Sequence, residues 1–131
     1  MACLKTYFQH KDLYQPLMEL SRNNEHLIVF SLEVVHFPCQ STNIPKQFLN
    51  QNLDDSSIDT ICGNIKEYFK QKKVNSAHVY IHIDSFVEKP EMDIFQVLYI
   101  IKSLQQTIQF PQVYLYKSEY LNSPFIDLQI K

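Results

Sequence analysis

Glycine is almost absent from this chain, in which Gly63 is the only one among 131 residues. Phosphate-cradling loops, nucleophile elbows and dinucleotide-binding turns need glycine, because the backbone there adopts a positive φ or comes close to the ligand. The sequence therefore argues against P-loop enzymes, Rossmann-type dehydrogenases and α/β-hydrolases. No cofactor is expected, although an enzyme that acts through side chains alone is still compatible with this composition.

An excess of basic residues is also absent. The chain has 14 acidic residues and 12 lysines and arginines, which gives a net charge of -2. Proteins that bind nucleic acid usually carry a clustered basic surface, so no nucleic acid is expected as a partner. The densest basic cluster is Lys70, Lys72 and Lys73. We interpret it as the end of a helix, where positive charge complements the helix dipole, and an anion site is the less favoured alternative.

The sequence lacks the roughly 20 consecutive apolar residues of a membrane span. Residues 1–12 contain no apolar core of a secretory signal. The three cysteines, Cys3, Cys39 and Cys62, are odd in number and far apart, without the pair spacing of a zinc site. Reduced thiols of this kind are typical of intracellular proteins. We therefore expect a cytoplasmic chain that makes no membrane contact.

Hydrophobic residues make up 45% of the chain, enough for one core in a single globular domain over residues 1–131. Residues 26–36 are apolar on both faces, which is typical of a strand inside a sheet covered on two sides. Residues 37–54 are predicted to be a polar connecting loop. The other periodic segments predict strands at 3–8, 76–85, 112–117 and 124–130, and helices at 11–22, 56–72 and 90–108.

The element order (β)αβ-αβαββ determines the expected fold class. Alternating strands and helices predict an α/β or α+β sandwich of two to three layers. The sheet is expected to be mixed and to contain four to five strands.

The segment HVYIHID, residues 78–84, alternates aliphatic and polar side chains. As a strand it would place His78, Tyr80, His82 and Asp84 on one face. We favour the interpretation that this face is solvated, as in many half-buried sheets. His78 and His82 cannot share a metal ion, because residues four apart on a strand are about 13 Å apart.

The alternative interpretation is a site at the end of this strand. His82 and Asp84 lie on the same face about 6.6 Å apart, and ligands gather at the carboxyl ends of strands in open α/β sheets. The candidate metal ligands are His36, His82 and Asp84, which suit zinc or iron, with Glu33 in place of His36 as a second possibility. Glu88 follows closely, so the catalytic candidates are His82, Asp84 and Glu88.

Tyrosines crowd the C-terminal segment VYLYKSEY, residues 113–120, which contains Tyr114, Tyr116 and Tyr120 and lies close to Phe125. Tyrosine is enriched at protein interfaces, and an unpaired edge strand can pair with another chain. Self-pairing of this kind would give a symmetric homodimer. The alternative is an ordinary distribution between core and surface. The predicted interface residues are Tyr114, Tyr116, Tyr120, Phe125 and Ile126.

The order of VYIHID, a long apolar helix and FIDLQI is similar to that in the second half of the early-region-4 nuclear regulatory proteins of adenoviruses. The resemblance covers less than half of the chain, and the first half departs from that family in length and pattern. What the resemblance implies is self-association. The glycine-poor usage, rich in lysine, isoleucine and asparagine, is also typical of an AT-rich genome such as that of a virus or an intracellular bacterium.

The sequence thus predicts a non-enzymatic interaction or regulatory protein, such as an adaptor, an inhibitor or a small subunit. Its expected partner is another protein, including a second copy of itself bound through the C-terminal strands. The alternative is a small metal-dependent hydrolase that uses His82, Asp84 and either His36 or Glu33.

Overall fold

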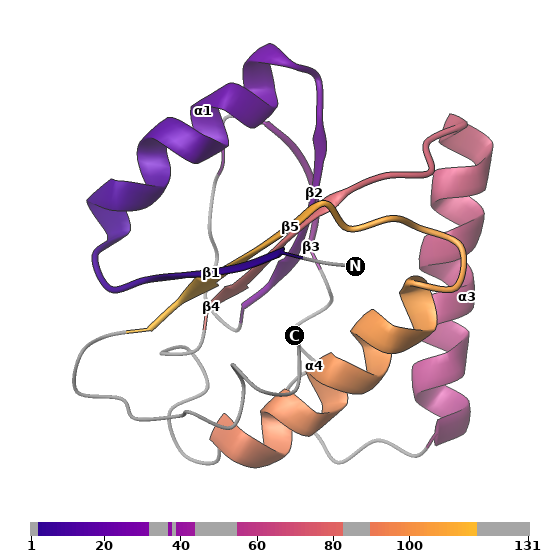
Figure 1. Cartoon of the computed structure of the whole chain (residues 1–131). Coiled ribbons are helices and arrows are strands. Elements are labelled where there is room, and N and C mark those ends of the chain that lie inside the picture. Colours follow the sequence, from indigo (N-terminus) through magenta and orange to yellow (C-terminus); the bar gives the residue numbers. More distant parts are fainter. Residues whose placement is uncertain (1–2, 32–36, 38, 44–54, 83–89, 118–131) are drawn as a thin grey trace.

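Five parallel strands form one sheet with helices on both faces in a computed structural model of the chain (Figure 1). The structure describes residues 3–31, 37, 39–43, 55–82 and 90–117. The order of the strands across the sheet is β1-β5-β4-β2-β3. The fold is therefore of the α/β class, as the alternation of strands and helices predicted.

The helices and strands have the following bounds. The strands are β1 (Cys3–Tyr7), β2 (His26–Phe30), β3 (Gln40–Asn43), β4 (His78–His82) and β5 (Gln112–Tyr116). The helices are α1 (Tyr14–Arg22), α3 (Asp55–Lys72) and α4 (Pro90–Leu104), and the 3-10 turn η1 (His10–Leu13) leads into α1.

All strand pairs of the described sheet are parallel, so the expectation of a mixed sheet is wrong. The pairs are β1 with β5, β5 with β4, β4 with β2, and β2 with β3. β5 lies between two parallel neighbours, because Tyr116 is in register with Tyr7 on one side and with His82 on the other. The predicted strand at 124–130 lies outside the described residues.

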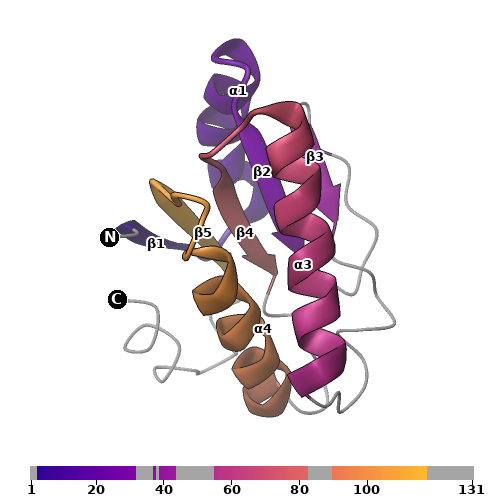
Figure 2. The same ribbon diagram turned by 90° about the vertical axis from the view of Figure 1, so that its right-hand side faces the viewer.

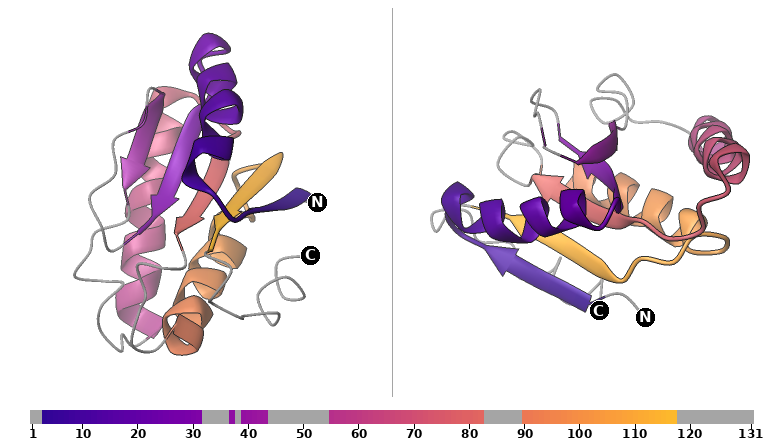
Figure 3. Two further views of the ribbon diagram at one scale, coloured as in Figure 1. Left: turned by 90° about the vertical axis from the view of Figure 1, so that its left-hand side faces the viewer. Right: turned by 90° about the horizontal axis from the view of Figure 1, so that it is seen from above.

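The sheet separates two apolar clusters, which gives three layers. On one face α1 packs its leucines, including Leu17 and Leu20, against Leu27 and Val29 of β2. On the other face α3 and α4 lie side by side over the sheet, and the alternate residues of β2 point toward them (Figure 2). Figure 3 shows α1 lying over the sheet when the molecule is seen from above. The prediction that the strand beginning at residue 26 is covered on two sides is confirmed, since every residue of β2 is buried.

Local sequence explains most element ends. Pro16 is the third residue of α1, in the first turn, where a backbone N–H has no partner within the helix and its loss costs little. α4 ends at Leu104, earlier than the predicted 108, yet Ile108 is buried in the turn that follows. The apolar periodicity therefore continues past the helix. Among the described residues, no helix is long and apolar enough to cross a membrane.

β3 was missed by the sequence prediction, which placed residues 37–54 in a loop. Its residues QSTN are polar, and it lies at the edge of the sheet, paired in parallel with β2. An edge strand is held by backbone hydrogen bonds on one side and needs no apolar face, so the alternation that reveals inner strands is absent. Residues 44–54 of the predicted loop lie outside the described residues.

Candidate functional site

The polar face of β4 lies inside the molecule, on the side that α1 covers. Tyr80 has an exposed fraction of 0% and His82 of 8%. The ring of Phe37 packs edge-on against Tyr80 at a centroid distance of 5.0 Å. The favoured interpretation of this face as solvated is therefore wrong. The strand is buried on both faces, as is usual for inner strands of parallel sheets.

At the amino end of β4, the His78 ring contacts the carboxylate of Glu25, which directly precedes β2. Its Nε2 lies 3.5 Å from Oε2 of Glu25, and its ring centroid is 6.0 Å from that of Tyr114. Burial lowers the pKa of His78, and the Glu25 carboxylate opposes part of that effect. His78 borders a cavity of about 440 Å³ between α1 and the sheet. Burial also raises the pKa of Tyr114 to about 12, so this phenol stays protonated.

At the carboxyl end of β4, His82 meets polar residues from two neighbouring strands. Its Nδ1 is 3.3 Å from Oγ of Ser31, which directly follows β2, and both side chains are buried. The His82 ring lies 5.0 Å from the ring of Tyr116, the last residue of β5. Lys117 comes next and is also buried, and its backbone N–H donates to the carbonyl of Tyr7 at 3.1 Å. The carboxyl edge of the sheet thus brings the side chains of Ser31, His82 and Tyr116 together.

This edge is also where the chain topology changes direction. From β2 the chain continues to β3 on one side, and from β4 it passes through α4 to β5 on the other side. β2 and β4 are neighbours, so the carboxyl ends of these two strands form the switch point at which parallel α/β sheets bind ligands. The hydrogen-bonded pair of Ser31 and His82 lies at that point.

Only some of the predicted metal-binding and catalytic residues belong to the described part of the chain. His82 is placed at the carboxyl edge, whereas His36, Asp84, Glu33 and Glu88 lie outside the described residues. Within the described ranges no group of three or more histidine, cysteine, aspartate or glutamate side chains could hold a metal ion. The metal triad of His36, His82 and Asp84, and the catalytic group of His82, Asp84 and Glu88, therefore stay predictions.

Two of the predicted interface residues are placed by the structure. Tyr114 is buried in the cluster beneath α1, and Tyr116 is half-buried and packs against the same cluster. Both belong to β5, whose two sides are already paired, so the edge strands of the described sheet are β1 and β3. Tyr120, Phe125 and Ile126 lie outside the described residues, and the C-terminal interface stays a prediction.

Sequence reasoning did not single out three features of this structure. Ser31 interrupts an apolar run and Lys117 follows one, and neither has a spacing signal that would mark it as part of a site. The third feature is an exposed apolar surface at the start of α1. It consists of Tyr14 and Met18, with exposed fractions of 65% and 38%, and Phe8, which precedes the helix, has an exposed fraction of 49%. Its signal was present in the sequence, because Tyr14 and Met18 are one helical turn apart and only flank the leucine face.

Comparison with known proteins gives no relative: no family model matches, and neither a curated protein nor a solved structure is significantly similar. An α/β fold supports many unrelated functions. The function must therefore be argued from the surfaces and side chains of this chain.

Proposed function

We propose that the chain is a non-enzymatic interaction protein and that it forms a homodimer. The observation that carries this proposal is the exposed apolar pair of Tyr14 and Met18, one turn apart on α1, with Phe8 also exposed before the helix. Leu17 and Leu20 of the same helix are buried, so the apolar surface of α1 extends from its buried face onto the exposed flank that carries Tyr14 and Met18. Grouped exposed apolar side chains mark interaction sites, and aromatic residues and methionine are enriched in them.

A second copy of the chain is the partner that we propose. The outer face of α1 can meet its own counterpart around a two-fold axis, which is the commonest symmetry of soluble oligomers. A net charge of only -2 opposes such pairing weakly. The C-terminal residues Tyr120, Phe125 and Ile126 are the second surface through which the dimer could form, as the sequence predicts.

The proposal is tested by sedimentation velocity over a range of concentrations. We expect the wild-type chain to sediment as a dimer, and Tyr14→Glu together with Met18→Glu to weaken association by about tenfold or more, because a charge replaces a central apolar contact. Val74→Glu is the matched control, since Val74 has a similar exposed fraction of 36% but follows α3 on the other side of the sheet.

The same measurement separates the two surfaces. If Ile126→Glu abolishes the dimer and the α1 variants do not, the C-terminal segment forms the interface and the role of α1 is wrong. A wild-type chain that remains monomeric at every concentration tested contradicts the homodimer itself.

A second candidate function is a small hydrolase at the carboxyl edge, and the contact between Ser31 and His82 favours it. A histidine beside a serine hydroxyl can accept its proton and activate it as a nucleophile. In the metal-dependent form predicted from the sequence, His82 would act with Asp84 and either His36 or Glu33.

Metal analysis of the purified protein and assays with chromogenic esters test this second function. Bound zinc or iron that is lost in His82→Ala supports the metal site. Ester hydrolysis that is lost in both His82→Ala and Ser31→Ala supports a serine nucleophile. Metal-free protein without hydrolytic activity contradicts both forms of the hydrolase.

A further inference from the structure

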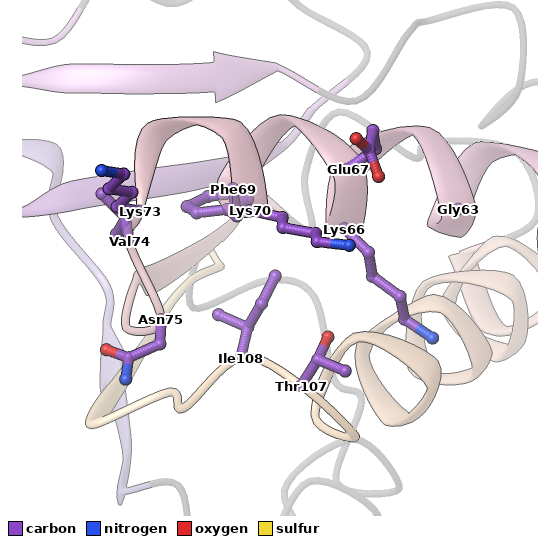
Figure 4. A pocket seen from close by; sticks show the side chains of 10 residues that line it. All are labelled: Gly63, Lys66, Glu67, Phe69, Lys70, Lys73, Val74, Asn75, Thr107 and Ile108. Carbon is purple, nitrogen blue, oxygen red and sulfur yellow. The ribbon is translucent and has the colours of Figure 1, made fainter.

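A groove lies between α3 and α4, on the face of the molecule opposite α1. It consists of two adjoining cavities of about 630 Å³ and 380 Å³. The larger one lies beside the C-terminal half of α3, and the smaller one extends toward α4. Gly63 and Lys66 border both cavities, so the two form one continuous surface. Figure 4 shows the larger cavity, with Ile108 opposite α3 and the side chain of Lys66 extending toward the neighbouring helix.

The groove combines an apolar floor with a basic rim. Phe69, Val74 and Ile108 line the larger cavity, of which Val74 is exposed and the other two are almost completely buried. The rim carries four lysines. Lys66 and Lys70 belong to α3, Lys73 directly follows that helix, and Lys102 belongs to α4.

None of these four lysines has a carboxylate partner within ion-pair distance among the described residues. The ammonium group of Lys66 donates only to neutral oxygens, to Oγ of Ser103 at 3.4 Å and to Oε1 of Gln106 at 3.2 Å. The two acids that border the groove contact neutral donors instead. Asp59 accepts from the hydroxyl of Tyr99 and Glu67 accepts from the amide of Gln71. The rim therefore carries four lysines against two acids, and within the described part of the chain none of these lysines is in an ion pair.

The helix dipole accounts for only part of this basic rim. Lys70 is in the last turn of α3, Lys73 directly follows that helix, and Lys102 is in the last turn of α4, where positive charge is favourable. Lys66 lies more than one turn before the end of α3, beyond the reach of this effect. The helix dipole therefore does not explain why a lysine occupies position 66, where its side chain extends toward α4.

Gly63 provides an independent observation at the same place. It is the only glycine in the chain, and it lies within α3 where glycine is less favourable than alanine. A Cβ added there would meet nothing within 4 Å, so no contact inside the protein requires its absence. Its effect is to leave the α3 backbone bare where the two cavities join, which allows a bound chain to approach closely.

We propose that this groove binds an extended acidic segment of a partner protein. Carboxylates of the segment contact the four lysines, and an apolar side chain rests on Phe69 and Ile108. Complementary charge determines which segments bind, and the buried apolar anchor supplies most of the affinity. A nucleic acid fits less well, because its phosphates would use the lysines and leave the apolar floor empty. The proposal goes beyond self-association and concerns the opposite face of the molecule.

The test measures binding of a fluorescein-labelled peptide to the full-length chain by fluorescence anisotropy. The peptide consists of glutamates and aspartates around one central phenylalanine. We expect saturable binding that weakens as salt is raised, and binding weaker by about tenfold or more for a peptide in which alanine replaces the phenylalanine. A peptide of the same length with lysines in place of the acids should not bind.

Variants of the protein locate the site. Lys66→Glu combined with Lys70→Glu should weaken peptide binding by about tenfold or more, whereas Lys5→Glu combined with Lys11→Glu, on the α1 side, should leave it unchanged. Gly63→Leu should also weaken binding, because its side chain would fill the junction of the cavities. Circular dichroism of each variant confirms that the fold is retained.

Three results would overturn the proposal. They are the absence of binding at low salt, binding that is equally affected by the two pairs of lysine substitutions, and tight binding of a single-stranded oligonucleotide where the acidic peptide fails. The groove variants should not change the oligomeric state. A monomeric chain that binds the peptide through Lys66 therefore contradicts only the homodimer, and a dimer that fails to bind contradicts only the groove.

Discussion

Two buried histidines link the stability of this protein to pH at the scale of single residues. Nε2 of His26 lies 2.7 Å from Oγ1 of Thr42, which connects β2 to the edge strand β3. Burial lowers the pKa of His26 below its ordinary value of 6.5, and Lys72 adds to this effect. The pKa of His78 is lowered in the same direction, again chiefly by burial. Both imidazoles are therefore kept neutral by the fold.

We predict that the free energy of unfolding falls as the pH is lowered from about 8 to about 5. The unfolded chain takes up protons on these histidines at their ordinary pKa, whereas the folded chain takes them up only at lower pH. The stabilisation is complete above pH 6.5 and is lost as the pH falls toward the lowered values in the folded state. Urea denaturation at several pH values measures this loss.

The double variant His26→Gln with His78→Gln is the control for this prediction. Its stability should depend less on pH over the same range, because the titrating groups are gone. If the wild-type protein becomes more stable on acidification, the neutral state of the two histidines is wrong.

Gly63 allows a second prediction at this scale. Gly63→Ala should raise the free energy of unfolding by about 1 kcal/mol, because alanine is the better helix former and the position is inside α3. The added methyl group meets no neighbour within 4 Å. Urea denaturation measures the gain, and Asn64→Gly at the next exposed position should change stability in the opposite direction. A loss of stability in Gly63→Ala would show that α3 needs the conformational freedom of glycine here.

The candidate site could be predicted only in part from single residues. Alternation in residues 78–84 correctly identified a strand and placed His82 near a carboxyl edge. It did not show that the polar face is buried, because a helix from another part of the chain covers that face. Ser31 was not found for a similar reason, since its contact with His82 joins two strands that are distant in the sequence.

At the scale of elements, α1 has one buried face and one exposed face. Its inner face packs Leu17 and Leu20 against the sheet, and its outer face exposes Tyr14 and Met18. We predict that Leu17→Ala lowers the free energy of unfolding by about 2–5 kcal/mol, because it leaves a cavity in the cluster beneath α1. Met18→Ala at the neighbouring exposed position should change it by only about 0.5 kcal/mol.

Chemical denaturation of both variants in parallel measures this difference in stability. If the exposed face forms the dimer, sedimentation velocity should show that Met18→Ala weakens association more than Leu17→Ala does. Similar losses of stability in the two variants would show that α1 is not divided into a buried face and an exposed face.

The elements themselves were predictable where apolar periodicity is strong. α3 begins and ends within one residue of the prediction, because its buried residues repeat with helical spacing over its length. Periodicity did not predict the end of α4, because Ile108 is buried four residues after the helix ends at Leu104. Apolar periodicity also gave no signal at β3, whose residues are polar and pair in parallel with β2.

At the scale of the whole molecule, the direction and order of the strands could not be predicted from the pattern. A residue pattern shows which faces of a strand are buried, but it does not show which strands are neighbours. Here the first described strand pairs with the last, since β1 lies beside β5. Consecutive strands are usually adjacent. That tendency would wrongly pair β1 with β2 and β3 with β4 in this sheet.

The pairing of β1 with β5 leads to a prediction about the complete fold. β1 is an edge strand whose only strand neighbour in the described sheet is β5, and the carbonyl of Tyr7 also accepts the N–H of Lys117. A variant lacking residues 2–8 would leave β5 as an edge strand, with the buried Val113 and Leu115 next to an unpaired backbone. Unpaired apolar edges pair with other chains.

We therefore expect this truncated variant to unfold at a lower urea concentration than the full chain and to aggregate, as measured by static light scattering during mild heating. Lys5→Ala combined with Thr6→Ala is the control, because it alters two side chains of β1 that are not buried and keeps the backbone hydrogen bonds to β5. A truncated chain that stays as stable and as free of aggregates as this control would mean that β5 does not need β1. The sheet would then be complete with β5 as its edge.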